Sequence, residues 1–220
     1  MSNFTIDLSL QRAINAIVVP GLMIGYKVIS QGDEFALLHE ESVSLPFLVI
    51  ERRRASGAAR RVARELMNSI GFVGLPILRG IFGAPIWPTE VVGSMAHDNQ
   101  IAVAAVGLRC DLDAVGIDIE PVASLLPDML ELIATSREQH VISDNPLRAK
   151  LLFSIKEAVY KAAYPLDHDL LDFHDIEVDF ASRLATTRSG RTFTLRWCVF
   201  SHVLVVATTQ NTSMNYLPSS

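Results

Sequence analysis

Two stretches with the hydrophobic period of a helix, each followed by strand-like runs, constrain the fold of this chain more than any other feature. Residues 51–70 and 147–163 both place apolar side chains at helical spacing along one side. The strand-like runs come in two groups, at 91–96, 101–107 and 114–120 and at 175–180, 192–199 and 202–208. This order predicts an α+β fold in which two similar lobes form a pseudo-dimer within one chain.

The repeat also predicts where the chain divides. We expect an N-terminal lobe at residues 1–112 and a C-terminal lobe at residues 113–220, joined with little linker. A chain of 220 residues is long enough for two lobes with cores of their own. Because ligands bind preferentially between packed units, we expect the active-site cleft to lie between the two lobes.

Charge and composition exclude several classes of protein. A net charge of −5 argues against bulk binding of nucleic acid, which needs a basic surface. The uncharged run at residues 13–26 contains Pro20 and is shorter than the ~20 apolar residues of a membrane-spanning helix, so it predicts core strand and turn. The first residues lack the pattern of a signal peptide. Cys110 and Cys198 lie in apolar runs and fit reduced core thiols. We therefore expect a cytoplasmic protein without membrane contact.

An acidic pair interrupts the strand pattern of residues 115–120, VGIDIE. Side chains alternate along a strand, so Asp118 and Glu120 share one face. Two carboxylates this close repel each other unless a positive charge lies between them, and the local sequence offers none. The pattern indicates that a positively charged group from elsewhere lies between these two carboxylates.

A third acidic side chain of interest lies in the helix pattern at residues 153–162, FSIKEAVYKA. Glu157 and Lys161 are four residues apart, which is also the commonest spacing of a structural ion pair in helices. If this helix packs near the acidic strand, Glu157 would give a third carboxylate. Three carboxylates are a ligand set that suits Mg²⁺ bound to a substrate phosphate.

Basic residues gather on the first predicted helix, although the chain as a whole is acidic. Its arginines are Arg52, Arg53, Arg54, Arg60, Arg61 and Arg64. A solvated helix face is the plain interpretation of this pattern. The alternative is an anion site, because guanidinium groups bind phosphate oxygens two at a time. Residues 93–97, GSMAH, could add backbone amides and the His97 ring to such a site, although this short motif alone is weak.

The three segments GSMAH, VGIDIE and FSIKEAVYKA, in this order, resemble the motif series of the phosphopantetheinyl transferases of the two-lobed enterobactin- and surfactin-synthetase type. The resemblance covers the chain from about residue 50 to the end. It implies a Mg²⁺-dependent enzyme of the holo-[acyl-carrier-protein] synthase type. Such an enzyme transfers the 4′-phosphopantetheine group of coenzyme A (CoA) to a serine of an acyl or peptidyl carrier protein, and adenosine 3′,5′-bisphosphate leaves. One copy of each motif suggests a monomer.

The resemblance also implies a role for each matched residue. The metal ligands would be Asp118, Glu120 and Glu157, and the catalytic residues would be Glu157, as the base on the serine, and Lys161, which steadies the leaving oxygen. CoA would be bound by Arg53, Arg60, Ser94, His97, Lys156 and Lys161. The neighbouring Arg52 or Arg54 could take the place of Arg53 in this set.

Two positions depart from the family pattern. Ala96 replaces a hydroxyl residue, and Ala84 stands where some members have a basic residue, a loss for which Arg79 could compensate. Both changes could weaken CoA binding. The group around His168 and His174 matches no ligand spacing and is expected to be a solvated loop.

Two alternative functions stay open. One is a Mg²⁺-dependent hydrolase of CoA or nucleotide pyrophosphates, and the other is a non-catalytic module that binds carrier proteins. The sequence does not identify the carrier, the pathway or the choice between Mg²⁺ and Mn²⁺.

Overall fold

The computed structural model describes residues 3–45, 49–125, 127–142 and 145–210. Its α-helices are α1 (Asn3–Ala16), α2 (His39–Ser44), α3 (Ile50–Ser69), α4 (Pro127–Ile133), α5 (Ser136–Ile142) and α6 (Pro146–Asp167), with short 3₁₀ turns η1 (Asp33–Phe35), η2 (Ile81–Gly83) and η3 (Phe173–Asp175). Its strands are β1 (Leu22–Val28), β2 (Leu78–Arg79), β3 (Pro85–Ile86), β4 (Val91–His97), β5 (Ile101–Leu108), β6 (Leu112–Pro121), β7 (Ile176–Asp179), β8 (Leu184–Thr187), β9 (Thr192–Val199) and β10 (His202–Gln210). The predicted α+β class is confirmed.

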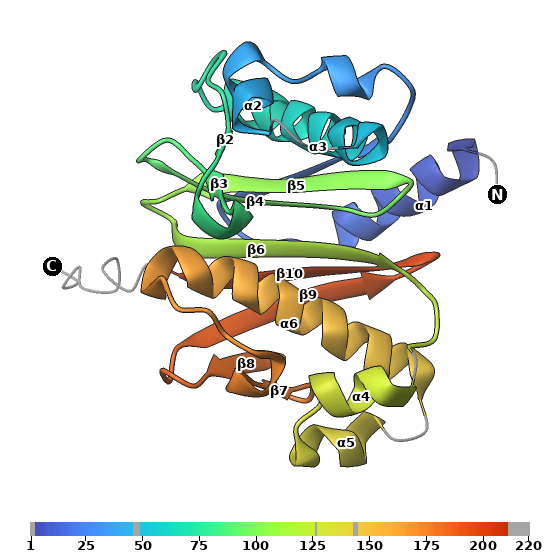
Figure 1. Ribbon diagram of the computed structural model, residues 1–220. Helices are drawn as coiled ribbons and strands as arrows, with labels where there is room; N and C mark the ends of the chain where they lie inside the picture. The colour runs from blue at the N-terminus through green and yellow to red at the C-terminus, as the bar shows by residue number, and fades with distance from the viewer. Residues whose placement is uncertain (1–2, 46–48, 126, 143–144, 211–220) are drawn as a thin grey trace, which may run out of the picture.

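Two antiparallel sheets form the centre of the molecule. The first has the strand order β1-β5-β4 and the second has the order β6-β10-β9-β8-β7. Figure 1 shows α3 on the outer side of the first sheet and α6 against the second, with the two sheets between these helices. Each half of the chain therefore places one long helix against one antiparallel sheet. That the two halves share one fold, with a boundary at residue 112, stays a prediction.

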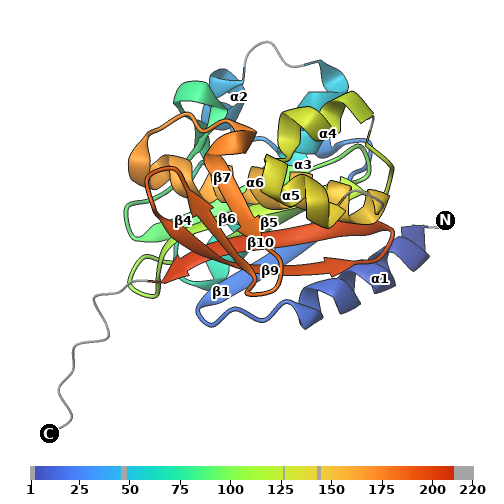
Figure 2. The ribbon, with the colours of Figure 1, turned by 90° about the horizontal axis from the view of Figure 1, so that it is seen from below.

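The space between the two sheets is filled by one apolar core. It joins side chains of β4 and β5 to side chains of β6 and β10, among them Val92, Val103, Ile117 and Leu204. Leu10 and Ile14 of α1 pack against the same core, and Figure 2 shows α1 beside β1 and β9. This shared core fixes β4 next to β6, the strands that contain the GSMAH and VGIDIE segments.

Most predicted elements are present, with differences that have local causes. The helix predicted at 147–163 continues to Asp167 through Pro165 and ends at His168 in the left-handed conformation (φ 52°). The surface loop predicted at 71–88 contains the short pair of strands β2–β3. The segment 13–26, predicted as strand and turn, begins as the last turn of α1 and becomes strand at Leu22, where β1 begins. Cys110 is exposed rather than buried, and both cysteines are free. No helix within the described ranges is long and apolar enough to cross a membrane.

Gly116 allows α6 to lie directly on β6. A Cβ atom at this position would be 1.8 Å from the carbonyl oxygen of Ala158, so that only glycine lets the two backbones approach this closely. Because side chains alternate along a strand, Asp118 and Glu120 lie on the same face as Gly116 and therefore also point toward α6. The glycine of the VGIDIE motif thus places the acidic pair under the long helix.

Candidate active site

The acidic pair of β6 meets two lysines of α6. Lys161 Nζ lies 2.7 Å from Asp118 Oδ1, and Lys150 Nζ lies 2.7 Å from Glu120 Oε2. Nothing in the local sequence neutralises the two carboxylates, but these lysines, which lie 43 and 30 residues further along the chain, do so. Lys150 was not identified from the sequence, since its partner is apparent only once α6 is laid along β6.

Two groups in this contact between α6 and β6 have no partner. Asp118 Oδ2 is buried and accepts no hydrogen bond from any described residue. Glu157, half-buried on α6, forms no hydrogen bond or ion pair within the described part of the chain. Burial raises the pKa of the Glu157 carboxyl; the charge of Lys161 opposes this effect, and the carboxylates of Asp118 and Glu120 add to it. Glu157 is therefore a carboxylate that gains from meeting a proton or a cation.

The three carboxylates expected to bind a metal are not gathered into a ready site. Within the described ranges, no three His, Cys, Asp or Glu side chains are arranged to hold a metal ion. The two lysines are the physical reason, since each already neutralises one carboxylate of the strand. The uncommitted oxygens of Asp118 and Glu157 still fit a hard divalent cation, because such ions are bound by carboxylates and keep several waters.

A small cavity of about 210 Å³ lies against Glu157 and Lys161. Its walls come from both halves of the chain: the segment 82–85, Trp87 and β4 on one side, and α6 with Tyr160 and Tyr164 on the other. Ser94 lines it as well, but its buried hydroxyl accepts a hydrogen bond from Ile117 N at 3.1 Å. Ser94 therefore ties β4 to β6, whatever it contributes to ligand binding.

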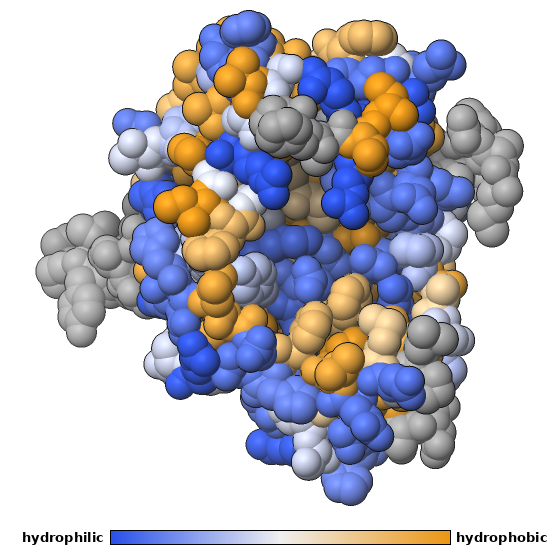
Figure 3. All heavy atoms as spheres, viewed as in Figure 1, coloured by the Kyte–Doolittle hydropathy of each residue, from blue (hydrophilic) through white to orange (hydrophobic). Residues whose placement is uncertain are grey.

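A larger cavity of about 400 Å³ adjoins the small one. The two share the lining residues Gly83, Pro85 and Met95, so they form one cleft, and Figure 3 shows a hydrophilic hollow between the region of α3 and the region of α6. The charged lining of the larger cavity consists of Arg52, Arg60, Arg79 and His97, and no described residue of this lining is Asp or Glu. In a chain of net charge −5, this arrangement is selective for anions.

Arg60 is the fixed member of this basic lining. Arg60 is 6% exposed. Its guanidinium donates from Nε to Ile77 O at 2.8 Å and from Nη1 to Ser56 Oγ at 3.0 Å. These bonds hold the planar group in one orientation, which favours a bidentate contact with a phosphate. The expected position of Arg60 at an anion site agrees with this geometry.

Arg53 does not face the cavity, and Arg52 takes its place. Arg53 donates to Ser42 Oγ, while Arg52 lines the cavity together with Ser56 and Arg60. Residues 52, 56 and 60 are four apart and so share one helix face, whereas residue 53 is turned away by about 100°. The sequence left open whether Arg52 or Arg54 takes the position given to Arg53. In the structure, Arg52 is the arginine that lines the cavity.

Lys156 corrects a second expectation, since it lies far from the basic cavity. Its side chain is fully buried and donates to Ile133 O at 2.8 Å, Phe173 O at 2.8 Å and Glu138 Oε2 at 2.6 Å. These three acceptors use all three of its N–H donors. Lys156 cannot bind a phosphate here, because it is turned to the opposite side of α6 from Lys161.

The neighbouring residues His97 and Ala96 of β4 point to opposite faces of the strand. His97 ends the strand at the exposed rim of the larger cavity. Its pKa is lowered, mainly because the cavity walls exclude solvent and also through the charges of Lys161 and Arg60. Ala96 points the other way, into the core between the sheets. A hydroxyl at that position would not face the cavity, so Ala96 gives no reason to expect weaker ligand binding.

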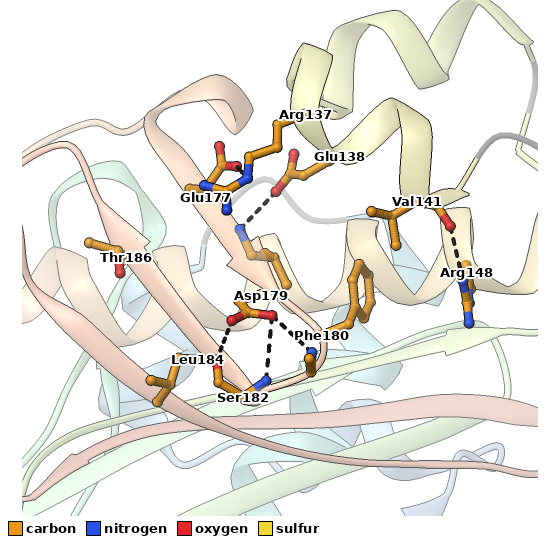
Figure 4. A pocket seen from close by; sticks show the side chains of 12 residues that line it. Arg137, Glu138, Val141, Arg148, Glu177, Asp179, Phe180, Ser182, Leu184 and Thr186 are labelled. Atoms are coloured by element: carbon orange, nitrogen blue, oxygen red, sulfur yellow. Dashed lines mark hydrogen bonds and ion pairs between the residues drawn. The ribbon is translucent and has the colours of Figure 1, made fainter.

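A further hollow of about 640 Å³, larger than either cavity of the cleft, lies between α5 and the β7–β8 hairpin. Figure 4 shows that several of its polar side chains form hydrogen bonds with neighbouring residues of the same lining. Asp179 accepts from Ser182 Oγ at 2.7 Å and from Ala181 N at 2.9 Å, and Glu138 accepts from Lys156. Among the described residues that line this hollow, Glu138 alone forms a hydrogen bond with a side chain of the GSMAH, VGIDIE or FSIKEAVYKA segment, and that side chain is the buried Lys156. We therefore place the active site in the cleft.

Comparisons with known proteins identify one family for both halves of the chain. The family model described as "4'-phosphopantetheinyl transferase N-terminal domain" matches residues 40–107. The model described as "4'-phosphopantetheinyl transferase superfamily" matches residues 114–214. Together they contain α3 with the arginine cavity, and β6 with α6.

Individual relatives give the same result. The 4'-phosphopantetheinyl transferase Svp of Streptomyces mobaraensis is 35% identical over 169 residues, which cover 74% of this chain and 66% of the relative. The 4'-phosphopantetheinyl transferase PptT of Mycobacterium tuberculosis is 35% identical over 147 residues, 65% of each chain. Enterobactin synthase component D of Escherichia coli is 26% identical over 162 residues, 70% of this chain and 76% of the relative. The match thus spans just under two thirds of the first two relatives.

Proposed function

The chain belongs to the 4'-phosphopantetheinyl transferase superfamily, and from this premise we propose that it transfers the 4′-phosphopantetheine group of CoA to a serine hydroxyl of an acyl or peptidyl carrier protein. Adenosine 3′,5′-bisphosphate is the second product. The observation that carries the proposal is the continuous cleft, which joins an anion-selective cavity to a partnerless carboxylate. CoA has a 3′-phosphate and a pyrophosphate, and the reaction breaks the pyrophosphate.

The larger cavity suits the phosphates of CoA. Arg52, Arg60 and Arg79 supply three guanidinium groups with no carboxylate beside them in the described lining. Arg79 gives this cavity the positive charge that Ala84 does not. Each charge-assisted hydrogen bond contributes about 1.5–3 kcal/mol, so that two or three of them are enough to hold a CoA phosphate tightly.

The chemical step belongs to the small cavity. The Glu157 carboxylate accepts the proton of the carrier serine, and the serine oxygen attacks the phosphorus next to the pantetheine arm. The bond from that phosphorus to the bridging oxygen breaks, and the electron pair leaves with adenosine 3′,5′-bisphosphate. Lys161, half-buried beside this cavity, stabilises the negative charge that forms on the departing oxygen. Phosphoryl transfer depends on such positioning and charge neutralisation more than on covalent chemistry by the protein.

A divalent cation, Mg²⁺ in our proposal, would be held by Asp118 through its free Oδ2 and by Glu157, with Glu120 joining if Lys150 releases it. When bound, the ion neutralises charge on the pyrophosphate. The buried, unpartnered oxygen of Asp118 supports this assignment, since an unsatisfied carboxylate oxygen in the interior is costly unless a ligand uses it. Lys161 would then be freed from Asp118 to serve the phosphates.

The test is the intact mass of purified apo carrier proteins after incubation with the full chain, CoA and Mg²⁺. We expect a stoichiometric gain of one phosphopantetheine group on a carrier that has the target serine, and none on its Ser→Ala variant. Carriers from fatty-acid, polyketide and nonribosomal-peptide synthesis should be compared, because the relatives include a component of enterobactin synthase. Cleavage of CoA without any change in carrier mass would instead identify a pyrophosphate hydrolase.

We further propose that the protein acts as a cytoplasmic monomer, since each motif occurs once and both halves of the chain line the cleft. Light scattering of the purified chain during gel filtration measures the mass directly. A stable oligomer under assay conditions would contradict this part of the proposal.

A further inference from the structure

Ser154 of α6 has a fully buried hydroxyl without a hydrogen-bond partner in the described part of the chain. Serine in a helix normally donates to a carbonyl of the preceding turn, and a buried hydroxyl without a partner costs stability. Alanine would fill the same place in the helix more favourably. A hydroxyl that weakens the resting structure is a candidate for a group that meets a ligand.

The position of Ser154 on α6 places it at the contact with the acidic strand. Residues 150, 154, 157 and 161 recur at helical spacing and share one face of α6. At the two ends of this row, Lys150 and Lys161 contact Glu120 and Asp118 of β6. On α6, Ser154 therefore lies between the two lysines that contact these carboxylates, one turn from Glu157. It is separate from the apolar side chains by which α6 packs on its sheet, such as Leu152, Ile155 and Val159.

Ser154 Oγ and Asp118 Oδ2 are both buried polar atoms without partners among the described residues, and they belong to α6 and β6, which pack on each other. The hydroxyl can donate and accept, and the carboxylate oxygen can only accept. A single small polar ligand in the contact between these two elements would satisfy both. A water molecule has the donors and acceptors that this pair needs.

We propose that Ser154 is a positioning residue of the transfer site, whose hydroxyl holds a water molecule of the hydration shell of the divalent cation. This inference rests on the proposed function, because it takes Asp118 and Glu157 as the residues that bind the ion. Hydrogen bonds from a second layer of residues orient the ligands of a metal, and their loss typically lowers metal affinity about 10–100-fold. Ser154 acts through that water and does not touch the substrate.

The experiment compares Ser154→Ala with wild type in three measurements. Binding of Mn²⁺ without CoA is followed by the electron paramagnetic resonance signal of the free ion. Thermal unfolding is measured in EDTA and with Mg²⁺. Transfer is measured as a function of Mg²⁺ concentration at saturating CoA and carrier. Ser69→Ala is the control, since Ser69 is an exposed serine of α3 outside the cleft.

We expect Ser154→Ala to bind Mn²⁺ about 10-fold more weakly and to need correspondingly more Mg²⁺ for half-maximal transfer. The rate at saturating Mg²⁺ should be close to that of wild type. In EDTA the variant should unfold at the same or a higher temperature, because it loses an unsatisfied hydroxyl, while its stabilisation by Mg²⁺ should be smaller. Ser69→Ala should match wild type throughout.

Unchanged Mn²⁺ affinity of Ser154→Ala, or an unfolding temperature that falls already in EDTA, would overturn the proposal and make Ser154 a structural residue. These outcomes differ from a failure of the proposed function. If wild type itself binds no Mn²⁺ or Mg²⁺, or transfers nothing to a carrier, the function fails first and Ser154 has no such role.

Discussion

Lys156 and Lys161 lie five residues apart on the same helix and are used in opposite ways. Lys156 is fully buried and gives its three donors to three acceptors, and its partner Glu138 also accepts from Thr135 N and Val178 N. Lys161 is partly exposed and holds one oxygen of Asp118, whose other oxygen has no partner among the described residues. The comparison teaches that a buried charge with every bond satisfied holds the fold together, whereas an incompletely satisfied one is available to a ligand.

The largest effect is expected for Glu157, which has no partner among the described residues and lies on the same side of α6 as Lys161. Glu157→Gln removes the proposed base but keeps its shape, so transfer should fall about 10²–10⁴-fold. The free energy of unfolding should not fall, because this carboxylate has no partner to lose. Rates are measured with a carrier in excess, and unfolding is followed in urea. Transfer within 10-fold of wild type would remove Glu157 from the chemistry.

For Lys156, whose three donors are all used, the effect should appear in stability instead. Glu138→Ala leaves Lys156 buried without its carboxylate, and breaking a buried pair in this way typically costs about 3–5 kcal/mol. Urea unfolding measures the loss. Glu65→Ala is the control, since Glu65 forms an exposed pair with Arg61, which should contribute about 1 kcal/mol or less. Equal losses in the two variants would contradict the view of Glu138 as a structural partner.

The arginines of α3 extend the comparison to the other half of the chain. Arg52 lines the basic cavity, whereas the neighbouring Arg53 is committed to Ser42. If uncommitted charges bind the ligand, Arg52→Ala should weaken CoA binding about 10- to 150-fold, as loss of about 1.5–3 kcal/mol implies, and Arg53→Ala should change it much less. Calorimetric titration with CoA decides the point. A larger loss for Arg53→Ala would restore the assignment made from the sequence.

The smallest effect concerns pH. The pKa of Glu157 is raised on folding, so its contribution to stability is complete below the ordinary pKa of glutamate and is lost as the pH rises through the folded value. In EDTA, the stability of Glu157→Gln relative to wild type should therefore grow across this window. Transfer by wild type should increase over the same window, since the base must be ionised. A stability difference that does not change with pH would contradict the assignment.

The sequence predicts the parts of this site that follow from local periods. The period of the helix brings Glu157 and Lys161 to one face, and that of the strand brings Asp118 and Glu120 to one face. It does not predict which carboxylate each lysine meets, because this depends on how α6 lies on β6 over Gly116. The burial of Lys156 was missed for a related reason: its partner Glu138 lies in α5, which was not predicted as a helix. The choice between Arg52 and Arg53 is set by the rotation of α3 on its sheet.

The most direct test replaces each of the two lysines by methionine and measures both unfolding and transfer. The account predicts opposite results for transfer. Lys156→Met should lose several kcal/mol of stability, since Glu138 remains buried without its cation, yet keep most of its transfer activity per folded molecule. Lys161→Met should also lose stability, because Asp118 loses its ion pair, but its folded molecules should lose transfer. Loss of transfer in folded Lys156→Met, with activity preserved in Lys161→Met, would contradict the separation of a structural side and a functional side of α6.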